Sequence, residues 1–141
     1  MADRSDIVAA ARSWIGTPYR HQASLRGVGA DCLGLVLGVW RDLGGPSPAI
    51  EPYAAGWSVA DRHETLWRKA SEWLDVREAA EAGDIVLLRM MRGGPAKHLA
   101  ILADPAGPTI IHAYSGREVT ESPFTQSWRR RVVACFRLPL E

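Results

Sequence analysis

The first half of the chain carries helical patterns of apolar residues separated by loops. Apolar positions recur at helical spacing from Ile7 to Ile15, and Gly16-Thr17-Pro18 ends the pattern. The run from Cys32 to Leu43 is apolar on nearly every side and stops at Gly44-Gly45-Pro46, as expected of a buried central helix. The segment 19–30 between these helices contains glycines and shows no periodicity, which predicts a loop.

A third helix is predicted after the proline-rich loop 46–57. Ser58 is its candidate N-cap, with Asp61 three residues later. Gly34 and Gly38, on one face of the second helix, lower its propensity but allow a neighbouring element to approach the backbone closely. The inner face of the third helix consists of Leu66, Trp67, Ala70, Trp73 and Leu74.

The second half changes to short strand-like runs. Turn residues such as Arg92-Gly93-Gly94-Pro95 separate these runs. Helices followed by strands are typical of the α+β class rather than of alternating βαβ units, and we expect an antiparallel meander of about five to six strands. The runs cover residues 84–89, 97–103, 109–114, 117–120 and 132–138.

Length and charge narrow the classes of function. The 141 residues predict one domain, 1–141. The chain has 17 basic and 16 acidic residues and a net charge of +1, which argues against nucleic acid as a partner. The polar start Met1–Asp6 does not have the pattern of a secretory signal, and no apolar run has membrane-spanning length. We therefore expect synthesis in the cytoplasm and no membrane insertion.

The candidate nucleophile is Cys32, at a loop-to-helix junction. The unpaired N–H groups and partial positive charge of a helix start favour a thiolate over a thiol. Cys135, the other cysteine, lies in the apolar run 132–136, where a small buried thiol is the usual finding. A disulfide between the two is not expected.

Two histidines lie in neighbouring strand-like runs and are candidate partners of Cys32. If the hairpin pairs residues whose numbers have an even sum, His98 and His112 share the face opposite the bulkier apolar residues Leu99, Ile101 and Ile111. Packing the Cys32 helix on the histidine face would complete a Cys-His-His line. Each residue alone is more often a packed core residue, so the hypothesis rests on their convergence.

In this line each group has a chemical role. Cys32 would attack a carbonyl, and His98 would take the thiol proton and pass it to the leaving amine. His112 would accept a hydrogen bond from the other nitrogen of His98, and the backbone N–H of Cys32 would stabilise the oxyanion.

The sequence lacks the motifs that are typical of zinc sites and of serine hydrolases. The sequence has no Cys-x-x-Cys, His-x-Glu or His-Glu-x-x-His unit, so no metal is expected, and no Gly-x-Ser-x-Gly elbow for serine chemistry. Of the six tryptophans, Trp57 and Trp128 are the only candidates for stacking on a sugar, because the others have helical core spacing.

Several short motifs follow one another along the chain. They are the segment 10–16, Thr17-Pro18-Tyr19-Arg20, Asp31-Cys32-Leu33-Gly34-Leu35-Val36, Ala82-Gly83-Asp84-Ile85-Val86, Lys97-His98-Leu99-Ala100-Ile101 and Ile111-His112-Ala113. Their order and spacing resemble those of the NlpC family of papain-like cell-wall peptidases, from about Ile7 to Leu138. Tyr19-Arg20-His21-Gln22 and Phe136-Arg137-Leu138 are similar to the phage and gene-transfer-agent branch, whose members sit at the tail tip and open peptidoglycan.

The resemblance implies a papain-like fold and hydrolysis of peptidoglycan stem peptides without a cofactor. The bond cut is typically that between D-glutamate, through its γ-carboxyl, and a diamino acid. By position, Cys32 would be the nucleophile, His98 the base and His112 the polar third residue. Tyr19 would lie beside the site, and Asp31 would bind the terminal amine of the substrate. The implied partners are the stem peptide and tail-tip proteins, in a particle tail that acts in the periplasm or cell wall.

Departures from the family pattern leave alternatives open. Leu33 stands where the family usually has serine, which removes a polar contact to a substrate amine. His21 and Gln22 replace a common aromatic and glycine pair, whereas Gly83 and Asp84 match a structural turn. One alternative is a catalytically weak or inactive structural tail-tip component with the same fold. The other is an amidase or acyltransferase that acts on another substrate.

Overall fold

The computed structural model describes residues 3–48, 64–104, 107–114 and 116–140. The helices are α1 (Arg4–Arg12), α2 (Cys32–Asp42), α3 (Thr65–Trp73) and the short α4 (Gln126–Arg129). The strands are β1 (Ser24–Leu25), β2 (Gly29–Ala30), β3 (Asp75–Arg77), β4 (Ile85–Arg89), β5 (Ala96–Ala103), β6 (Thr109–Ala113), β7 (Val119–Pro123) and β8 (Val132–Arg137).

The three predicted helices are present, but their ends differ. α1 ends at Arg12, before the predicted end near Ile15, and the sequence did not predict the short α4. Asp3 and Asp6 form a reciprocal capping box at the start of α1, and Asp31 caps α2. The third helix begins at Thr65, after Glu64 in a left-handed conformation. Ser58, its predicted cap, lies outside the described residues.

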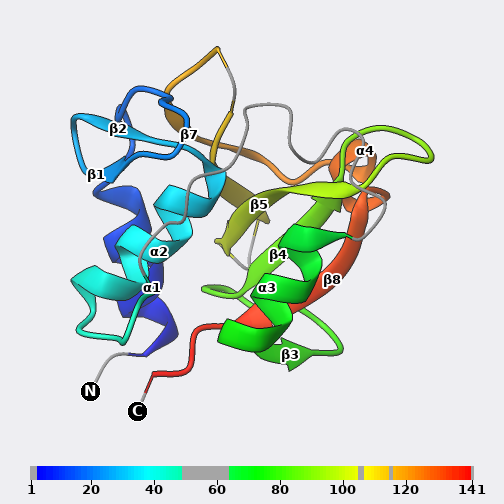
Figure 1. Ribbon diagram of the computed structural model, residues 1–141, viewed down its shortest axis with the longest axis horizontal. Helices are drawn as coiled ribbons and strands as arrows, with labels where there is room; N and C mark the ends of the chain where they lie inside the picture. The colour runs from blue at the N-terminus through cyan, green and yellow to red at the C-terminus, as the bar shows by residue number, and fades with distance from the viewer. Residues whose placement is uncertain (1–2, 49–63, 105–106, 115, 141) are drawn as a thin grey trace.

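Six strands form one antiparallel sheet in the order β3-β8-β4-β5-β6-β7 (Figure 1). Strands β4 to β7 form a meander, as predicted. The last predicted run, β8, does not continue it but crosses back to pair with the free side of β4, so the expectation that all five runs form one meander is wrong. The α+β class is therefore confirmed. β7 starts at Val119, two residues later than predicted, and the predicted loop 19–30 contains the small β1–β2 hairpin. The short β3 has only exposed residues, so it carried no apolar signal in the sequence.

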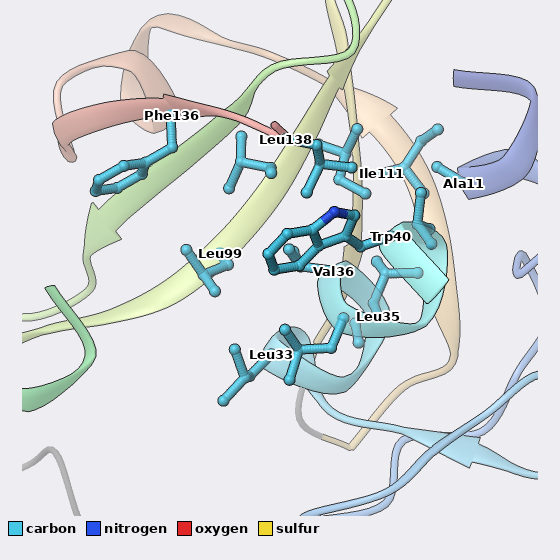
Figure 2. Packing of buried hydrophobic residues seen from close by; sticks show 14 of the residues in the cluster. Ala11, Leu33, Leu35, Val36, Trp40, Leu99, Ile111, Phe136 and Leu138 are labelled. Atoms are coloured by element: carbon cyan, nitrogen blue, oxygen red, sulfur yellow. The ribbon is translucent and has the colours of Figure 1, made fainter. Parts of the chain in front are cut away.

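The main core lies between one face of the sheet and the helices α1, α2 and α3 (Figures 1 and 2). Leu99, Ile101 and Ile111 contribute the sheet side of this core, and nearly all of α2 from Leu33 to Trp40 is buried against it. A different side of α2 lies against the preceding loop, where Gly34 allows a close approach because a Cβ there would collide with the Ala23 carbonyl oxygen. The predicted close approach to the helix backbone is thus confirmed.

The Gly83 and Asp84 turn is held by a buried ion pair. Asp84 is 0% exposed, and its Oδ1 and Oδ2 accept hydrogen bonds from Nε and Nη2 of Arg137 at 2.7 and 2.8 Å. Oδ2 also accepts the backbone N–H of Glu81 at 2.8 Å. This pair joins the start of β4 to the end of β8, as the structural interpretation of the motif predicts.

We expect Arg137→Ala to lower the free energy of unfolding by about 3–5 kcal/mol, because it leaves the buried Asp84 carboxylate without its cation. Denaturant unfolding at pH 7 measures the change. Arg4→Ala is the matched control, since Arg4 also pairs with Glu81, at 2.7 Å, but on the surface. An exposed ion pair contributes little to stability, so the denaturation midpoint of Arg4→Ala should stay at the wild-type value. Equal losses in the two variants would contradict this account.

Candidate active site

Cys32 is the first residue of α2, and the residue before it fixes the start of the helix. Asp31 is 2% exposed, and its Oδ1 accepts the backbone N–H of Gly34 at 2.7 Å. Its Oδ2 accepts the backbone N–H of Gln22 at 2.8 Å. One carboxylate therefore ties the first turn of α2 to the preceding loop and holds Cys32 in place. Binding of a substrate amine by Asp31 stays a prediction, since both oxygens are engaged with backbone donors here.

The thiol of Cys32 lies against the backbone of β5, in the first part of that strand, which does not pair with β6. The pairs between β5 and β6 run from Ile101 to Ala103. Nearer the start of β5, the thiol donates to the carbonyl oxygen of Lys97 with an Sγ to O distance of 3.6 Å. The backbone N–H of Leu99 donates to the sulfur. The sulfur thus occupies the place beside β5 that a neighbouring strand would take, one residue from His98.

The two histidines share a face of the sheet, as predicted. The β5–β6 register pairs Ile101 with Ile111, an even sum, so His98 and His112 point to the face opposite these residues. His98 pairs with Leu88, which belongs to the apolar cluster of that second face.

The prediction that α2 packs on the histidine face is wrong. The helix packs on the face of Leu99, Ile101 and Ile111, where the buried apolar residues of α2 join the main core (Figure 2). The start of the helix also reaches the backbone of β5 beside His98, through the contact of Cys32 with the Lys97 carbonyl oxygen. The site therefore lies at the first half of β5, between the two faces, and not under the helix.

The histidines form a hydrogen-bonded line that continues to a serine. Nε2 of His98 lies 2.8 Å from Nδ1 of His112. Nε2 of His112 lies 2.9 Å from Oγ of Ser122 on β7. These bonds leave Nδ1 of His98 as the nitrogen outside the line, and therefore as the one that can exchange a proton with a thiol.

Burial keeps both histidines neutral. His98 is 6% and His112 3% exposed, and the rings of Tyr114 and Trp128 pack around them with centroid distances of 5.2 to 6.0 Å. Loss of hydration lowers the pKa of His98 to about 3, with a smaller effect of the charge on His112, and lowers the pKa of His112 to about 4. At neutral pH His98 is thus an uncharged base.

The Cys32 thiol is also neutral in the resting site. Burial raises its pKa to about 12, and the negative charge of Asp31 acts in the same direction. The backbone N–H groups of Leu99, Leu33 and Cys32 itself lower the pKa, but by less than burial raises it. The expectation that the helix start favours a thiolate is therefore wrong for this state. A neutral thiol has to lose its proton before or as its sulfur acts as a nucleophile.

Tyr19 lies close enough to the nucleophile to sense its charge. Burial, with smaller contributions from the charges of Cys32 and Asp31, raises the pKa of Tyr19 to about 12. The backbone of Tyr19 pairs with Ala30, which leads directly into Asp31 and Cys32. This position agrees with the predicted place of Tyr19 beside the site.

Comparison with known proteins identifies the fold. No family model and no curated protein matches the sequence. Among solved structures, the NlpC/p60 domain of the peptidoglycan hydrolase SagA is 23% identical, with a TM-score of 0.60 over 97% of this chain and 100% of that one. The chain has the NlpC/p60 fold. At this identity the likeness establishes the fold alone.

Two longer proteins show the same likeness. An NLP/P60-family protein from Staphylococcus aureus, described as similar to lipoprotein, is 18% identical with a TM-score of 0.65, over 100% of this chain and 43% of that one. NlpC2 from Trichomonas vaginalis is 17% identical with a TM-score of 0.66, over 100% of this chain and 48% of that one. The chain therefore spans less than half of these two NlpC/p60 proteins.

Some residues around the site carried no signal in the sequence. Ser122 was missed because the strand-like run was predicted to end at residue 120, whereas β7 extends to Pro123. Tyr114 was not singled out, and Trp128, a candidate for sugar stacking, packs instead on His112 at 5.2 Å with its ring nearly perpendicular. Trp57 lies outside the described residues. Leu33 is 8% exposed and packs in the core, so it presents no side chain to a substrate in this conformation.

The described residues contain no group of three His, Cys, Asp or Glu side chains that could hold a metal ion. Among the described helices, none combines the length and the apolar character needed to cross a bilayer.

The neutral histidines of this NlpC/p60 fold predict acid destabilisation. An unfolded histidine titrates near pH 6.5, whereas His98 and His112 titrate at about 3 and about 4 when folded. Between these values the unfolded chain binds more protons, so stability present above pH 6.5 is lost as the pH falls toward 4. Near pH 5 the two rings together should give a slope of about 2 kcal/mol per pH unit.

Urea unfolding at pH 7, 6 and 5 measures this slope, and His112→Asn is the comparison. Removal of one buried histidine should lower the slope by about half, since each ring adds one proton to the unfolded chain. The same slope in both proteins would show that other groups cause the acid destabilisation.

Proposed function

We propose that the protein is a cysteine peptidase that hydrolyses peptidoglycan stem peptides. The observation that carries the proposal is the placement of Cys32, at the start of α2, beside the β5 backbone next to His98, whose ring is hydrogen-bonded to His112. Peptide hydrolysis by a cysteine enzyme requires a nucleophile, a neutral base and a group that orients the base. The NlpC/p60 fold, which the domain of the peptidoglycan hydrolase SagA also has, supports the choice of substrate.

The proposed first half-reaction forms a thioester. The Cys32 thiol transfers its proton to Nδ1 of His98 as the sulfur attacks the peptide carbonyl carbon, and the backbone N–H of Cys32 stabilises the oxyanion. His98 then protonates the leaving amine, and the C–N bond breaks. In the second half-reaction, water attacks the thioester, His98 takes the water proton, and the thiol is restored as the C–S bond breaks.

The finer assignment concerns the bond and the biological setting. We propose that the enzyme cuts between the γ-carboxyl of D-glutamate and the diamino acid. It would be made in the cytoplasm, join a phage or gene-transfer-agent tail beside tail-tip proteins, and act in the periplasm or cell wall as DNA enters. The support for the tail is the resemblance carried by Tyr19-Arg20-His21-Gln22 and Phe136-Arg137-Leu138.

Digestion of purified sacculi tests the reaction. We expect soluble fragments whose masses correspond to hydrolysis at the γ-D-glutamyl bond, and no release by Cys32→Ala protein measured in parallel. Fragments cut at the sugar-proximal amide, or transfer products on defined muropeptides, would favour the amidase or acyltransferase alternative. No release at all would favour the structural alternative. Detection of this chain by mass spectrometry in purified particles tests the tail assignment separately.

A further inference from the structure

The line of histidines ends on a serine that the mechanism above does not use. Ser122 lies on β7, paired with Ile110, so it shares the sheet face of both histidines. Its Oγ lies 2.9 Å from Nε2 of His112. We propose that Ser122 is a positioning residue, whose hydroxyl accepts a hydrogen bond from His112 and thereby keeps Nδ1 of His98 unprotonated. This inference rests on the proposed function, because only a catalytic base requires that tautomer.

Two arrangements of the hydrogen atoms along the line, here called proton orders, fit the observed distances. In the first, His98 donates from Nε2 to Nδ1 of His112, and His112 donates from Nε2 to Ser122. His98 then has a bare Nδ1 that can accept the thiol proton. In the second, every bond is reversed, so Ser122 donates and Nδ1 of His98 carries a hydrogen. A neutral His98 in this second order cannot act as a base toward Cys32.

The acceptor at the end of the line favours the productive order. A buried N–H without a partner is more costly than a buried lone pair, so without the Ser122 hydroxyl the Nε2–H form of His112 becomes unfavourable. Trp128, whose ring lies 5.2 Å from that of His112, is a poor replacement, because its indole nitrogen only donates and its ring face is a much weaker acceptor than a hydroxyl. Loss of the hydroxyl should therefore move the population toward the unproductive order.

Kinetics of three variants separate this role from packing. For Ser122→Ala we expect kcat on a defined stem peptide to fall about 5- to 50-fold, with KM unchanged, because the competent tautomer becomes a minor form. Ser122→Thr keeps the hydroxyl on a strand position and should restore most of kcat. Thr120→Val is the matched control. Thr120 lies on β7, the strand of Ser122, directly opposite His112 on β6, and its replacement should leave kcat unchanged.

Nitrogen-15 NMR of the imidazole rings supplies a readout that does not depend on activity. In the wild type and in Ser122→Thr, Nδ1 of His98 should have the shift of an unprotonated nitrogen, and in Ser122→Ala that of a protonated one. Unchanged shifts in Ser122→Ala, or a Ser122→Thr variant as impaired as Ser122→Ala, would overturn the proposal. If the shifts change as expected but the wild type cleaves no stem peptide, the proton order stands and the peptidase proposal fails.

Discussion

Cys32→Ala should abolish the release of stem-peptide fragments from sacculi while the protein stays folded. The sulfur is the only group in the proposed mechanism that forms a bond to the substrate, so its removal leaves no route to the thioester. Loss of a catalytic nucleophile of this kind lowers the rate by at least about 10⁴-fold. The variant gives up two contacts of the sulfur, with the Lys97 carbonyl and the Leu99 N–H. Alanine suits a helix start, so we expect a change in stability of about 1 kcal/mol.

Cys135→Ala is the matched control for this experiment. Cys135 is the other free thiol and lies in β8 opposite Val86, where it takes no part in the proposed chemistry. Its replacement should leave fragment release at the wild-type rate. The measurement is the yield of soluble fragments over time, together with a thermal unfolding curve for each protein. Fragment release by folded Cys32→Ala protein would refute the peptidase proposal.

The sequence was sufficient to place the two histidines, because alternation in a strand is a strict rule. Once the hairpin register has an even sum, His98 and His112 must share a face, and the structure has that register. The choice of face for α2 was wrong, since alternation does not say which face a helix covers. In the structure α2 joins the core cluster on the Leu99 and Ile101 side.

The charge state of the nucleophile could not be predicted from its position in a helix. A helix start contributes a local effect that the sequence reveals, whereas burial of the thiol depends on the packing of Tyr19 and β5 around it. Burial raises the pKa of Cys32 more than the surrounding N–H groups lower it. In the same way, Ser122 enters the site only through the exact length and register of β7, which are tertiary properties.

His98→Gln should lower kcat by about 10²- to 10⁴-fold, the usual contribution of a general base. It should also change the pH dependence of the reaction. With a thiol whose pKa is about 12, attack without a base requires the rare thiolate, so the variant should gain about tenfold in rate per pH unit from pH 7 to 10. The wild type should be flat over this range, because His98 is already neutral and the proton moves during attack.

Rates on a defined stem peptide at pH 7 to 10 measure both effects, and His112→Asn is the informative comparison. That variant keeps the base but replaces its imidazole partner with a shorter amide, which holds the ring of His98 less firmly. It should be slower than the wild type but equally flat with pH. A wild-type rate that itself rises tenfold per pH unit would mean that hydroxide, and not His98, generates the nucleophile. A flat profile in His98→Gln would mean that another group takes the thiol proton. The slope with pH therefore tests the role of His98 independently of how much activity each variant retains.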